Sequence, residues 1–410
     1  MEKGNEIKTV VPALRFPEFI NMGNWKIEIL SNISSNIFDG IHQTPKYVNE
    51  GIPFYSVENI VSNKNNKYIS EKDYLLYSST NKVEKGDILI SRIGTIGKSV
   101  VVNWDCRFYI YVTLAAVKKT NKFDSYFLSS FFQSEFYQKE ILSRSLLNAV
   151  PCKINMEELR KTRILLPEIR EQQKIANCLS SLDDLIEATA QKVEALKGHK
   201  KGLMQRLFPA EGKNVPDLRF PEFQRTQVWE DAILGTVADY ENGKAHENEI
   251  DEDGDFIVVN SKFISTDGEV IKRTNTPYCL ADKEDILMVL SDVPNGRAIA
   301  KCFFVDESGK YTVNQRICRL RSKSINSKFL FYLINRNPYF LSFDDGVKQT
   351  NLKKSEVLEC PLMIPSSPIE QQKIADLLSS IDDLIIATEQ RIKSLEKHKK
   401  GLMQQLFPKI

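Results

Sequence analysis

The sequence predicts an α+β protein in which two similar domains, each a mixed β-sheet with a helix, are joined by two long antiparallel coiled-coil helices in a pseudo-twofold internal repeat. One observation is a repeated block, since Val11–Phe19 (VPALRFPEF) returns as Val215–Phe223 (VPDLRFPEF), each with a tryptophan behind it. A second is a repeated helical segment, because Glu171–Pro209 and Glu370–Pro408 are identical at 27 of 39 positions. The stretches between these repeats resemble each other only faintly, which indicates one task performed at two places.

Both repeated helical segments carry a heptad pattern with no internal proline. Apolar side chains recur in steps of three and four residues, which is typical of a coiled coil. We expect the two helices to pair with each other, with the packing of each helix on its own domain alone as the alternative. Polar layers at Thr189 and Thr388, and lysines at Lys200 and Lys399, should help to fix the register. The predicted seam consists of Ile175, Leu179, Leu182, Ile186, Val193, Leu196, Ile374, Leu378, Ile381, Ile385, Ile392 and Leu395.

The domains between the repeats are predicted to contain both strands and helices. Runs of aliphatic and β-branched residues, bounded by glycines and polar turns, predict a compact and partly barrel-like sheet in each domain. One helix is expected near Ser125–Leu142 and its counterpart near Ser327–Leu341. The expected segments are an N-terminal segment with the first LRFPEF block (1–24), a first domain (25–167), a first long helix (168–209), a linker with the second block (210–224), a second domain (225–365) and a second long helix (366–410).

The amino-acid composition limits the classes of function that the chain can have. The hydrophobic and charged fractions, 42% and 27%, are those of a globular protein, and the absence of a long apolar run or a signal-peptide core predicts a cytoplasmic protein without a membrane partner. Seven cysteines without CxxC spacing and four scattered histidines favour buried, reduced thiols and no metal site. The net charge of +2 gives little support to nucleic-acid binding. Residues 20–165 carry 19 Lys and Arg against 14 Asp and Glu, whereas residues 224–364 carry 18 against 22.

Two short motifs resemble catalytic ones without their context. Gly94–Ser99 (GTIGKS) ends like a phosphate-binding loop, but the first glycine of that motif would fall at Arg92, and a strand-like VVV follows where a helix is needed. A β-turn that presents Lys98, and Arg297 at the matching place in the second domain, is the better interpretation. Asn337–Phe340 (NPYF) lacks the second proline of the adenine-methyltransferase pattern. We therefore expect a non-catalytic chain.

Several of these motifs together resemble one known family. The doubled LRFPEF blocks, the turn Gly86–Lys98 (GDILISRIGTIGK) and the helix entries LLPEIREQQKIA and MIPSSPIEQQKIA are similar to the specificity subunit of type I restriction–modification enzymes. Asp39–Ile60 also resembles a common opening of the target-recognition domains in that family. The resemblance covers nearly the whole chain, although the turn of the second domain (VLSDVPNGR) departs from the pattern.

The resemblance implies a function. Each variable domain would be a target-recognition domain that reads one half of a split double-stranded DNA site. The helix pair would measure the spacer and dock two methyltransferase subunits, with nuclease/translocase subunits joining the full complex. The chain itself would bind no cofactor, because S-adenosylmethionine, ATP and Mg would belong to the partner subunits. A coiled-coil scaffold carrying two protein-binding domains is the alternative, whereas a fused methyltransferase–nuclease has no room in this chain.

Base reading requires bidentate polar side chains in the major groove, with other Lys, Ser and Thr groups on phosphates. For each candidate, a solvated loop residue is the alternative interpretation. In the first domain the candidates are His42, Gln43, Lys46, Tyr47, Asn59, Arg92, Thr95, Lys98 and Lys153. In the second domain they are Asn260, Lys262, Asn295, Arg297, Lys348, Gln349, Thr350 and Asn351.

Overall fold

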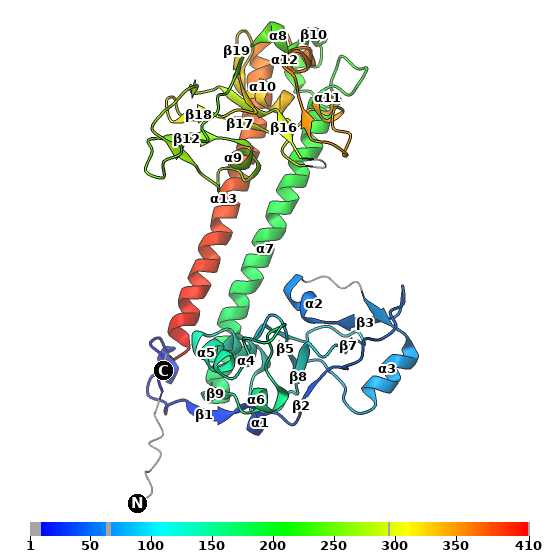
Figure 1. Ribbon diagram of the computed structural model, residues 1–410, viewed down its shortest axis with the longest axis vertical. Helices are drawn as coiled ribbons and strands as arrows, with labels where there is room; N and C mark the ends of the chain where they lie inside the picture. Colours follow the sequence, from blue (N-terminus) through cyan, green and yellow to red (C-terminus); the bar gives the residue numbers. More distant parts are fainter. Residues whose placement is uncertain (1–9, 63–66, 294–295, 409–410) are drawn as a thin grey trace, which may run out of the picture. The chain divides into compact units, whose positions relative to one another are not determined.

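The computed structural model describes residues 10–62, 67–293 and 296–408. It consists of two compact units (Figure 1). The first comprises the described residues up to Gln191 together with those from Glu389 onward, and the second comprises Lys192–Thr388. Each unit therefore contains one variable domain and a part of each long helix. The predicted architecture, two similar α+β domains with two long helices, is confirmed.

The first unit is built from short elements followed by a long helix. The strands are β1 (Lys26–Ile29), β2 (Ile37–Asp39), β3 (Ile52–Tyr55), β4 (Tyr68–Ile69), β5 (Ile88–Ser91), β6 (Ser99–Val101), β7 (Tyr109–Ile110), β8 (Leu114–Val117) and β9 (Arg163–Leu166). The helices are η1 (Pro17–Phe19), α1 (Leu30–Ile33), α2 (Val57–Ser62), α3 (Glu71–Ser78), α4 (Ser125–Phe132), α5 (Glu135–Ser143), α6 (Met156–Arg160) and the start of α7 (Ile169–Leu207).

The second unit has a corresponding order of elements. The strands are β10 (Glu230–Ile233), β11 (Ala238–Asn242), β12 (Phe256–Val259), β13 (Arg273–Thr274), β14 (Leu280–Ala281), β15 (Ile286–Val289), β16 (Ser291–Asp292), β17 (Cys302–Phe304), β18 (Tyr311–Val313), β19 (Ile317–Ser322), β20 (Thr350–Asn351) and β21 (Pro361–Ile364). The helices are η2 (Pro221–Phe223), α8 (Leu234–Val237), α9 (Ser261–Ser265), α10 (Ser327–Ile334), α11 (Pro338–Leu341), α12 (Lys354–Leu358) and the start of α13 (Pro368–Leu406).

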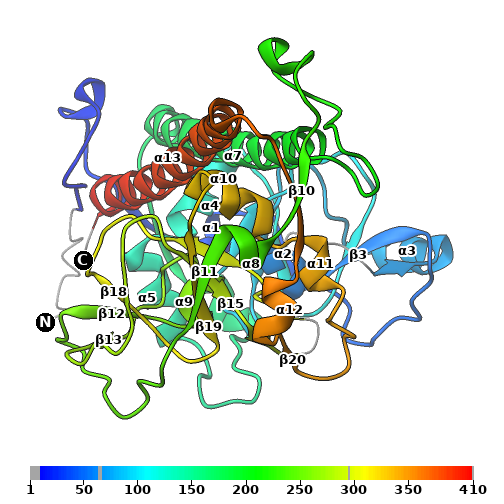
Figure 2. The same cartoon turned by 90° about the horizontal axis from the view of Figure 1, so that it is seen from above.

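The two domains share one sheet topology although their sequences differ. A four-stranded antiparallel sheet has the order β2-β8-β5-β6 in the first domain and β11-β19-β15-β17 in the second. A second sheet, which we call the smaller sheet because its strands are short, has three strands in the first domain (β4-β3-β7) and four in the second (β13-β12-β18-β14). It contains a parallel pair in each domain, β3 with β7 and β12 with β18. The first and last strands pair antiparallel, β1 with β9 and β10 with β21, and bring the entry and exit of each domain together. In the first domain, α3 and β3 lie at one end and α4 and α5 at the other (Figures 1 and 2).

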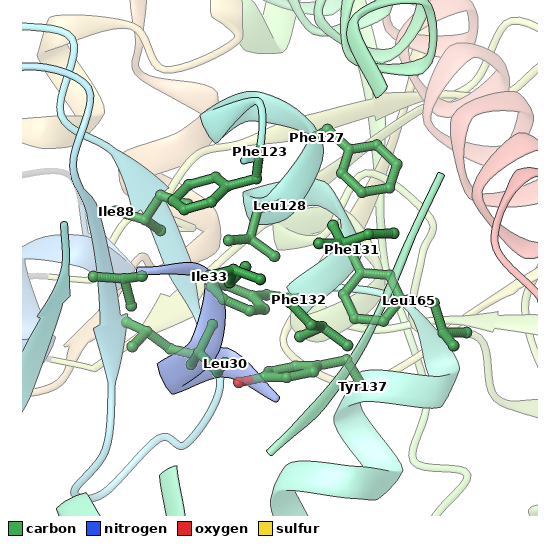
Figure 3. Packing of buried hydrophobic residues seen from close by; sticks show 14 of the residues in the cluster. Leu30, Ile33, Ile88, Phe123, Phe127, Leu128, Phe131, Phe132, Tyr137 and Leu165 are labelled. Carbon is green, nitrogen blue, oxygen red and sulfur yellow. The ribbon is translucent and has the colours of Figure 1, made fainter. Parts of the chain in front are cut away.

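Aromatic side chains fill the core of the first domain (Figure 3). Phe127, Phe131 and Phe132 of α4 are completely buried, and so is Tyr137 of α5. The Phe132 and Tyr137 rings lie 4.5 Å apart between centroids. Burial of this much apolar surface is the main stabilising term of the domain. Burial also raises the pKa of Tyr137, so its hydroxyl stays protonated and hydrogen-bonds the hydroxyl of Thr162 at 3.2 Å.

Each long helix ends against the core of a domain. The Phe407 ring, just beyond α13, makes an edge contact with Trp25 in the first unit, with 6.3 Å between ring centroids. The Phe208 ring, just beyond α7, makes the same contact with Trp229 in the second unit, also at 6.3 Å. The repeated LFP sequence at both helix ends is therefore explained by core packing.

The single helix predicted in each domain is wrong, because the structure has two shorter helices at each place. In the first domain Ser134 ends the run, since its hydroxyl accepts a hydrogen bond from a backbone N–H of the next turn and starts α5. In the second domain Arg336 adopts a left-handed φ of 59°, and the side chain of Asn337 then caps α11. Such caps satisfy the free N–H groups of a new helix start. The Asn337–Phe340 motif is thus a helix start.

The repeated motifs meet in a buried cluster in each unit, which we call the clasp. In the first unit the clasp consists of Arg15 of the LRFPEF block, Trp25 and Glu171 of the EQQK segment. The guanidinium of Arg15 donates two hydrogen bonds to the Glu171 carboxylate, at 2.8 and 2.7 Å, and the Trp25 indole N–H donates a third at 3.3 Å. The side chains of Arg15 and Glu171 are only 6% and 1% exposed.

The clasp of the second unit, Arg219, Trp229 and Glu370, has the same geometry. Arg219 donates to the Glu370 carboxylate at 2.7 and 2.8 Å, and the Trp229 indole N–H does so at 3.4 Å. The next residue of each long helix, Gln172 or Gln371, accepts a hydrogen bond from the backbone N–H that precedes α4 or α10, at 2.9 and 2.8 Å. The repeated residues therefore fasten each domain to the start of its long helix.

The long helices run antiparallel within each unit, because the start of one helix packs beside the end of the other. The lysines expected in the seam form ion pairs across it, with Lys399 bound to Asp183 at 2.5 Å in the first unit and Lys200 to Asp382 at 2.6 Å in the second. The hydroxyls of the two seam threonines bond the carbonyl one turn earlier. Seam residues that are buried are Ile175, Leu179, Val193, Ile374, Leu378, Ile381 and Ile385, and those half-buried are Leu182, Ile186, Leu196, Ile392 and Leu395.

Two expectations from composition concern the whole chain. Four of the seven cysteines are buried and Cys152 and Cys178 are half-buried, but the expectation of burial is wrong for Cys106, which is exposed. Within the described ranges, none of the helices combines the length and apolar character that a membrane span requires.

Replacing Glu370 by alanine would leave the Arg219 guanidinium buried without its partner. Because an unpaired buried charge is strongly destabilising, we expect E370A to lose about 3–5 kcal/mol in the free energy of unfolding. Urea unfolding followed by tryptophan fluorescence measures this loss. The matched control is Asp217→Ala, which breaks an exposed pair with Lys213 and should leave the unfolding curve almost unchanged. Similar curves for the two variants would show that the clasp does not hold the domain.

Candidate nucleic-acid interface

Three segments of the first domain converge at one end of its four-stranded sheet. They are the loop after β2 (residues 40–47), the turn between β5 and β6 (residues 92–98) and the loop between α5 and α6 (residues 144–155), which we call the β2 loop, the β5–β6 turn and the tip loop. Asp39 and Arg92 join the first two through an ion pair of 2.9 Å. The backbone N–H of Gly94 joins the turn to the tip loop by donating to the Cys152 carbonyl at 2.9 Å.

The β2 loop starts at a glycine for a steric reason. A Cβ added at Gly40 would lie 2.1 Å from the carbonyl oxygen of Ile110, so no other residue allows this close approach. Gly243 occupies the same place in the second domain, where an added Cβ would lie 2.1 Å from the carbonyl oxygen of Asn314. The two domains therefore begin their candidate interfaces at equivalent positions.

Arg92 is an internal residue, in contrast to its prediction as a base reader. Its guanidinium donates to the carbonyl oxygens of Ile154 at 3.2 Å and Val112 at 3.0 Å, in addition to the pair with Asp39. Burial lowers the pKa of the Arg92 guanidinium, and the negative charge of Asp39 opposes that shift. Through its Nε and Nη1 groups the side chain links Asp39, at the start of the β2 loop, to Ile154 of the tip loop.

Asn59 is likewise buried and serves the fold. Its side-chain oxygen accepts hydrogen bonds from the backbone N–H and the hydroxyl of Ser56, at 2.7 and 3.1 Å. Its burial contradicts the expectation of an accessible reader.

The remaining candidates of the first domain are accessible. Thr95 and Lys98 project from the β5–β6 turn, where Gly94 and Gly97 adopt left-handed φ values of 80° and 84°. The predicted turn that presents Lys98 is confirmed, because β5 and β6 are paired strands on either side of it. His42, Gln43, Lys46 and Tyr47 are exposed on the β2 loop, and Lys153 is half-buried in the tip loop.

The turn of the second domain is built differently. Asp292 follows Ser291 as Arg92 follows Ser91, and its carboxylate accepts hydrogen bonds from the backbone N–H groups of three residues of its own turn. Arg297 is exposed at the end of this turn. The strand β16 pairs with β20, so the turn lies beside the loop between α11 and α12 (residues 342–353), the second tip loop.

The second tip loop carries four candidates beside the turn that ends at Arg297. Gln349 donates from its amide to the Ser291 hydroxyl at 2.7 Å, and Thr350 is buried with its hydroxyl on Asp344 at 3.0 Å. Lys348 and Asn351 are exposed. The last three candidates are elsewhere or undescribed: Asn260 caps α9 beside the smaller sheet, Lys262 is exposed on α9, and Asn295 lies outside the described residues.

Ion pairs occupy some cationic groups of the second domain and leave others available, while its excess of acidic groups is unchanged. Arg321 pairs with the buried Asp285 at 2.7 Å, and Arg319 pairs with Glu241. Arg297 has no ion pair with any residue that the structure describes. The first domain shows the same pattern, since Lys46, Lys98 and Lys153 form no ion pair within the described part of the chain. Cationic groups are thus available at both loop clusters.

Two copies of one fold, each with a cluster of polar and cationic loops, define a tandem recognition protein. The family model of the type I restriction modification DNA specificity domain matches residues 39–197 and 227–397. The chain belongs to this family, and the resemblance expected from the motifs is confirmed. The protein is accordingly a specificity subunit of the type I restriction system class, with two DNA target-recognition domains.

Individual proteins are similar to this chain over 60% or more of its length. A chain from Methanocaldococcus jannaschii, described provisionally as the MjaX specificity subunit of a type I restriction enzyme, is 26% identical over 94% of this chain and 93% of its own length. The MjaVIII specificity subunit from the same organism is 28% identical over 60% of this chain and 61% of its own. The fold matches the crystal structure of an S subunit from M. genitalium with a TM-score of 0.62, at 18% identity and with coverage of 98% and 100%. A chain of another type I system matches with a TM-score of 0.53, at 14% identity over 93% of this chain and 96% of that one.

Arg92 and Lys98 should respond differently to substitution by alanine. R92A removes the buried partner of Asp39 and leaves only the exposed His42 beside it, so it should lower the free energy of unfolding by about 3 kcal/mol. K98A should leave stability unchanged, weaken DNA binding and reduce the slope of log affinity against log salt by about one. Thermal unfolding and DNA titrations at several salt concentrations separate the two effects. A stable R92A variant with altered base preference would restore Arg92 as a reader.

Proposed function

We propose that this chain is the non-catalytic sequence-recognition subunit of a type I restriction–modification complex and reads a bipartite double-stranded DNA site, with one domain for each half-site. The observation that carries the proposal is the duplication of the frame with different loops. Both clasps have the same hydrogen bonds, whereas the turns present Thr95 and Lys98 in one domain and Arg297 in the other.

A duplicated reader is advantageous for physical reasons. Two modules in one chain bind with a high effective concentration when both half-sites are suitably spaced. The cationic groups at each cluster would contact phosphates, and the polar side chains would meet base edges. Different loop residues on one frame then give different half-site sequences.

The long helices would measure the spacer and dock two methyltransferase subunits. Supporting this role, Leu185 of α7 and Leu384 of α13 are exposed at equivalent positions, and Ile386 is exposed close by. Exposed apolar side chains on a helix favour a protein partner. Nuclease/translocase subunits would complete the complex in the cytoplasm. S-adenosylmethionine, ATP and Mg would be held by these partners, and this chain would bind none of them.

The alternative is a scaffold whose two domains bind proteins. Duplex DNA binding that weakens steeply with salt, and that prefers one sequence over its scrambled form, distinguishes the reader from the scaffold. The direct test maps methylated adenine in the host genome with and without this gene. Loss of one bipartite motif on deletion supports the proposal, whereas an unchanged methylome in a host with active methyltransferase partners contradicts it.

Exchange of one domain should change one half of the recognised site. We expect that replacing residues 225–365 by the corresponding domain of another specificity subunit alters one half of the methylated motif and preserves the other, because each domain has its own core and loops. Methylome sequencing of the host provides the measurement. A motif that changes in both halves, or in neither, would contradict separate readers.

Insertion of one heptad into each long helix should change the spacer. Seven residues lengthen a helix by about 10 Å, roughly three base pairs of B-DNA, while the seam remains in phase. We expect a longer preferred spacer or loss of binding, measured with a series of DNA duplexes that differ in spacer length. Seven residues inserted after the exposed Glu211, outside the helices, provide the control. An unaltered spacer preference after the helix insertions would remove the ruler role.

A further inference from the structure

The two most exposed large apolar side chains of the described residues occupy equivalent places in the two domains. Val150 of the first tip loop is 100% exposed and Val347 of the second tip loop is 75% exposed. Each loop lies between a pair of short helices, α5 and α6 or α11 and α12, and beside the turn that carries Lys98 or Arg297. Because the two domains differ in sequence almost everywhere else, an exposed valine in both tip loops indicates a common role.

The first tip loop presents Val150 on an ordered base. Leu146 and Lys153 exchange two backbone hydrogen bonds, at 2.7 and 3.3 Å, and close the loop between them. The Cys152 thiol donates to the Gly94 carbonyl at 2.8 Å and anchors the loop to the β5–β6 turn. The neighbouring Leu147 is also exposed. The outward position of Val150 therefore belongs to a fixed loop conformation.

The second tip loop is also ordered, but by hydrogen bonds to the carboxylates of two of its own residues. Asp344 accepts hydrogen bonds from the Gly346 backbone N–H and the Thr350 hydroxyl, both at 3.0 Å. Asp345 accepts from the backbone N–H groups of Val347 and Lys348, at 2.9 and 3.0 Å. These bonds order the loop, in which Asp345 remains exposed, and leave the Val347 side chain at its outer surface.

We infer that Val150 and Val347 read thymine, each by placing its methyl groups against a thymine C5-methyl in the major groove of one half-site. This inference rests on the proposed function. The cationic groups of each loop cluster, Lys98 and Lys153 or Arg297 and Lys348, suit phosphates on either side of a groove. In the second cluster Lys348 shares the tip loop with the carboxylates of Asp344 and Asp345. The thymine methyl is the apolar group that base edges offer in the major groove, and apolar side chains recognise it there. Each half-site should therefore contain at least one A·T pair opposite its tip loop.

The test compares thymine and uracil at each A·T pair of the site established by the methylome. The full chain is titrated with duplexes in which one thymine at a time is replaced by uracil, which lacks the methyl group. We expect about fourfold weaker binding at one position of the first half-site, the effect of one methyl group left unburied. Val150→Ser should weaken binding to the thymine duplex similarly and abolish the difference between thymine and uracil. Val347→Ser should do the same for the other half-site alone.

The matched control is Leu75→Ser, which removes a side chain 59% exposed on α3. That helix lies at the opposite end of the first domain from α5, where the tip loop begins (Figures 1 and 2). L75S should keep both the affinity and the uracil effect of the unmodified chain.

Several results would overturn the inference while the proposed function stands. These are specific binding without any uracil effect, a uracil effect that persists in V150S and V347S, or a half-site without an A·T pair. A V150S chain that binds DNA normally but associates more weakly with the methyltransferase subunit would identify the tip as a protein contact. Absence of sequence-specific binding by the unmodified chain would instead overturn the proposed function and this inference together.

Discussion

The buried arginine–glutamate pair of each clasp is the interaction on which the rest of the structure depends. It joins the LRFPEF block, the first strand of the domain and the start of a long helix through one carboxylate, Glu171 or Glu370. Separating these parts would leave a charge buried without its partner, which is strongly unfavourable. The attachment of each domain to its own helix is therefore independent of the residues exposed on the candidate loops, which take no part in the clasp.

The two domains show how a constant frame accepts different readers. In the first domain the turn is held by the Asp39–Arg92 ion pair, and in the second by the Asp292 carboxylate on backbone N–H groups. Both solutions satisfy their polar groups inside the domain and leave neighbouring side chains exposed. Variation of the exposed residues then changes the chemistry of the surface at little cost in stability, because surface substitutions have small effects.

Net charge was a poor guide to function for this chain, and the structure explains why. Residues 224–364 carry more acidic than basic groups, but some of these groups, such as the buried Asp285 and its partner Arg321, are paired with each other within the domain. The potential that DNA would meet depends on the groups at the loop cluster, where Arg297 and Lys348 are exposed together with Asp345. The net charge of the domain also counts groups that never face a ligand.

The sequence by itself determined the repeat, the two long helices and the family, because heptad spacing and repeated motifs are local signals that survive without coordinates. It also located the turn that presents Lys98. Only the tertiary structure decided that Arg92 and Asn59 face inward, that Ser134 divides a helix and that Val150 stands at a loop tip. Burial and hydrogen-bond partners arise between residues far apart in the chain, so residue type and spacing cannot distinguish an arginine that binds DNA from one that holds a loop.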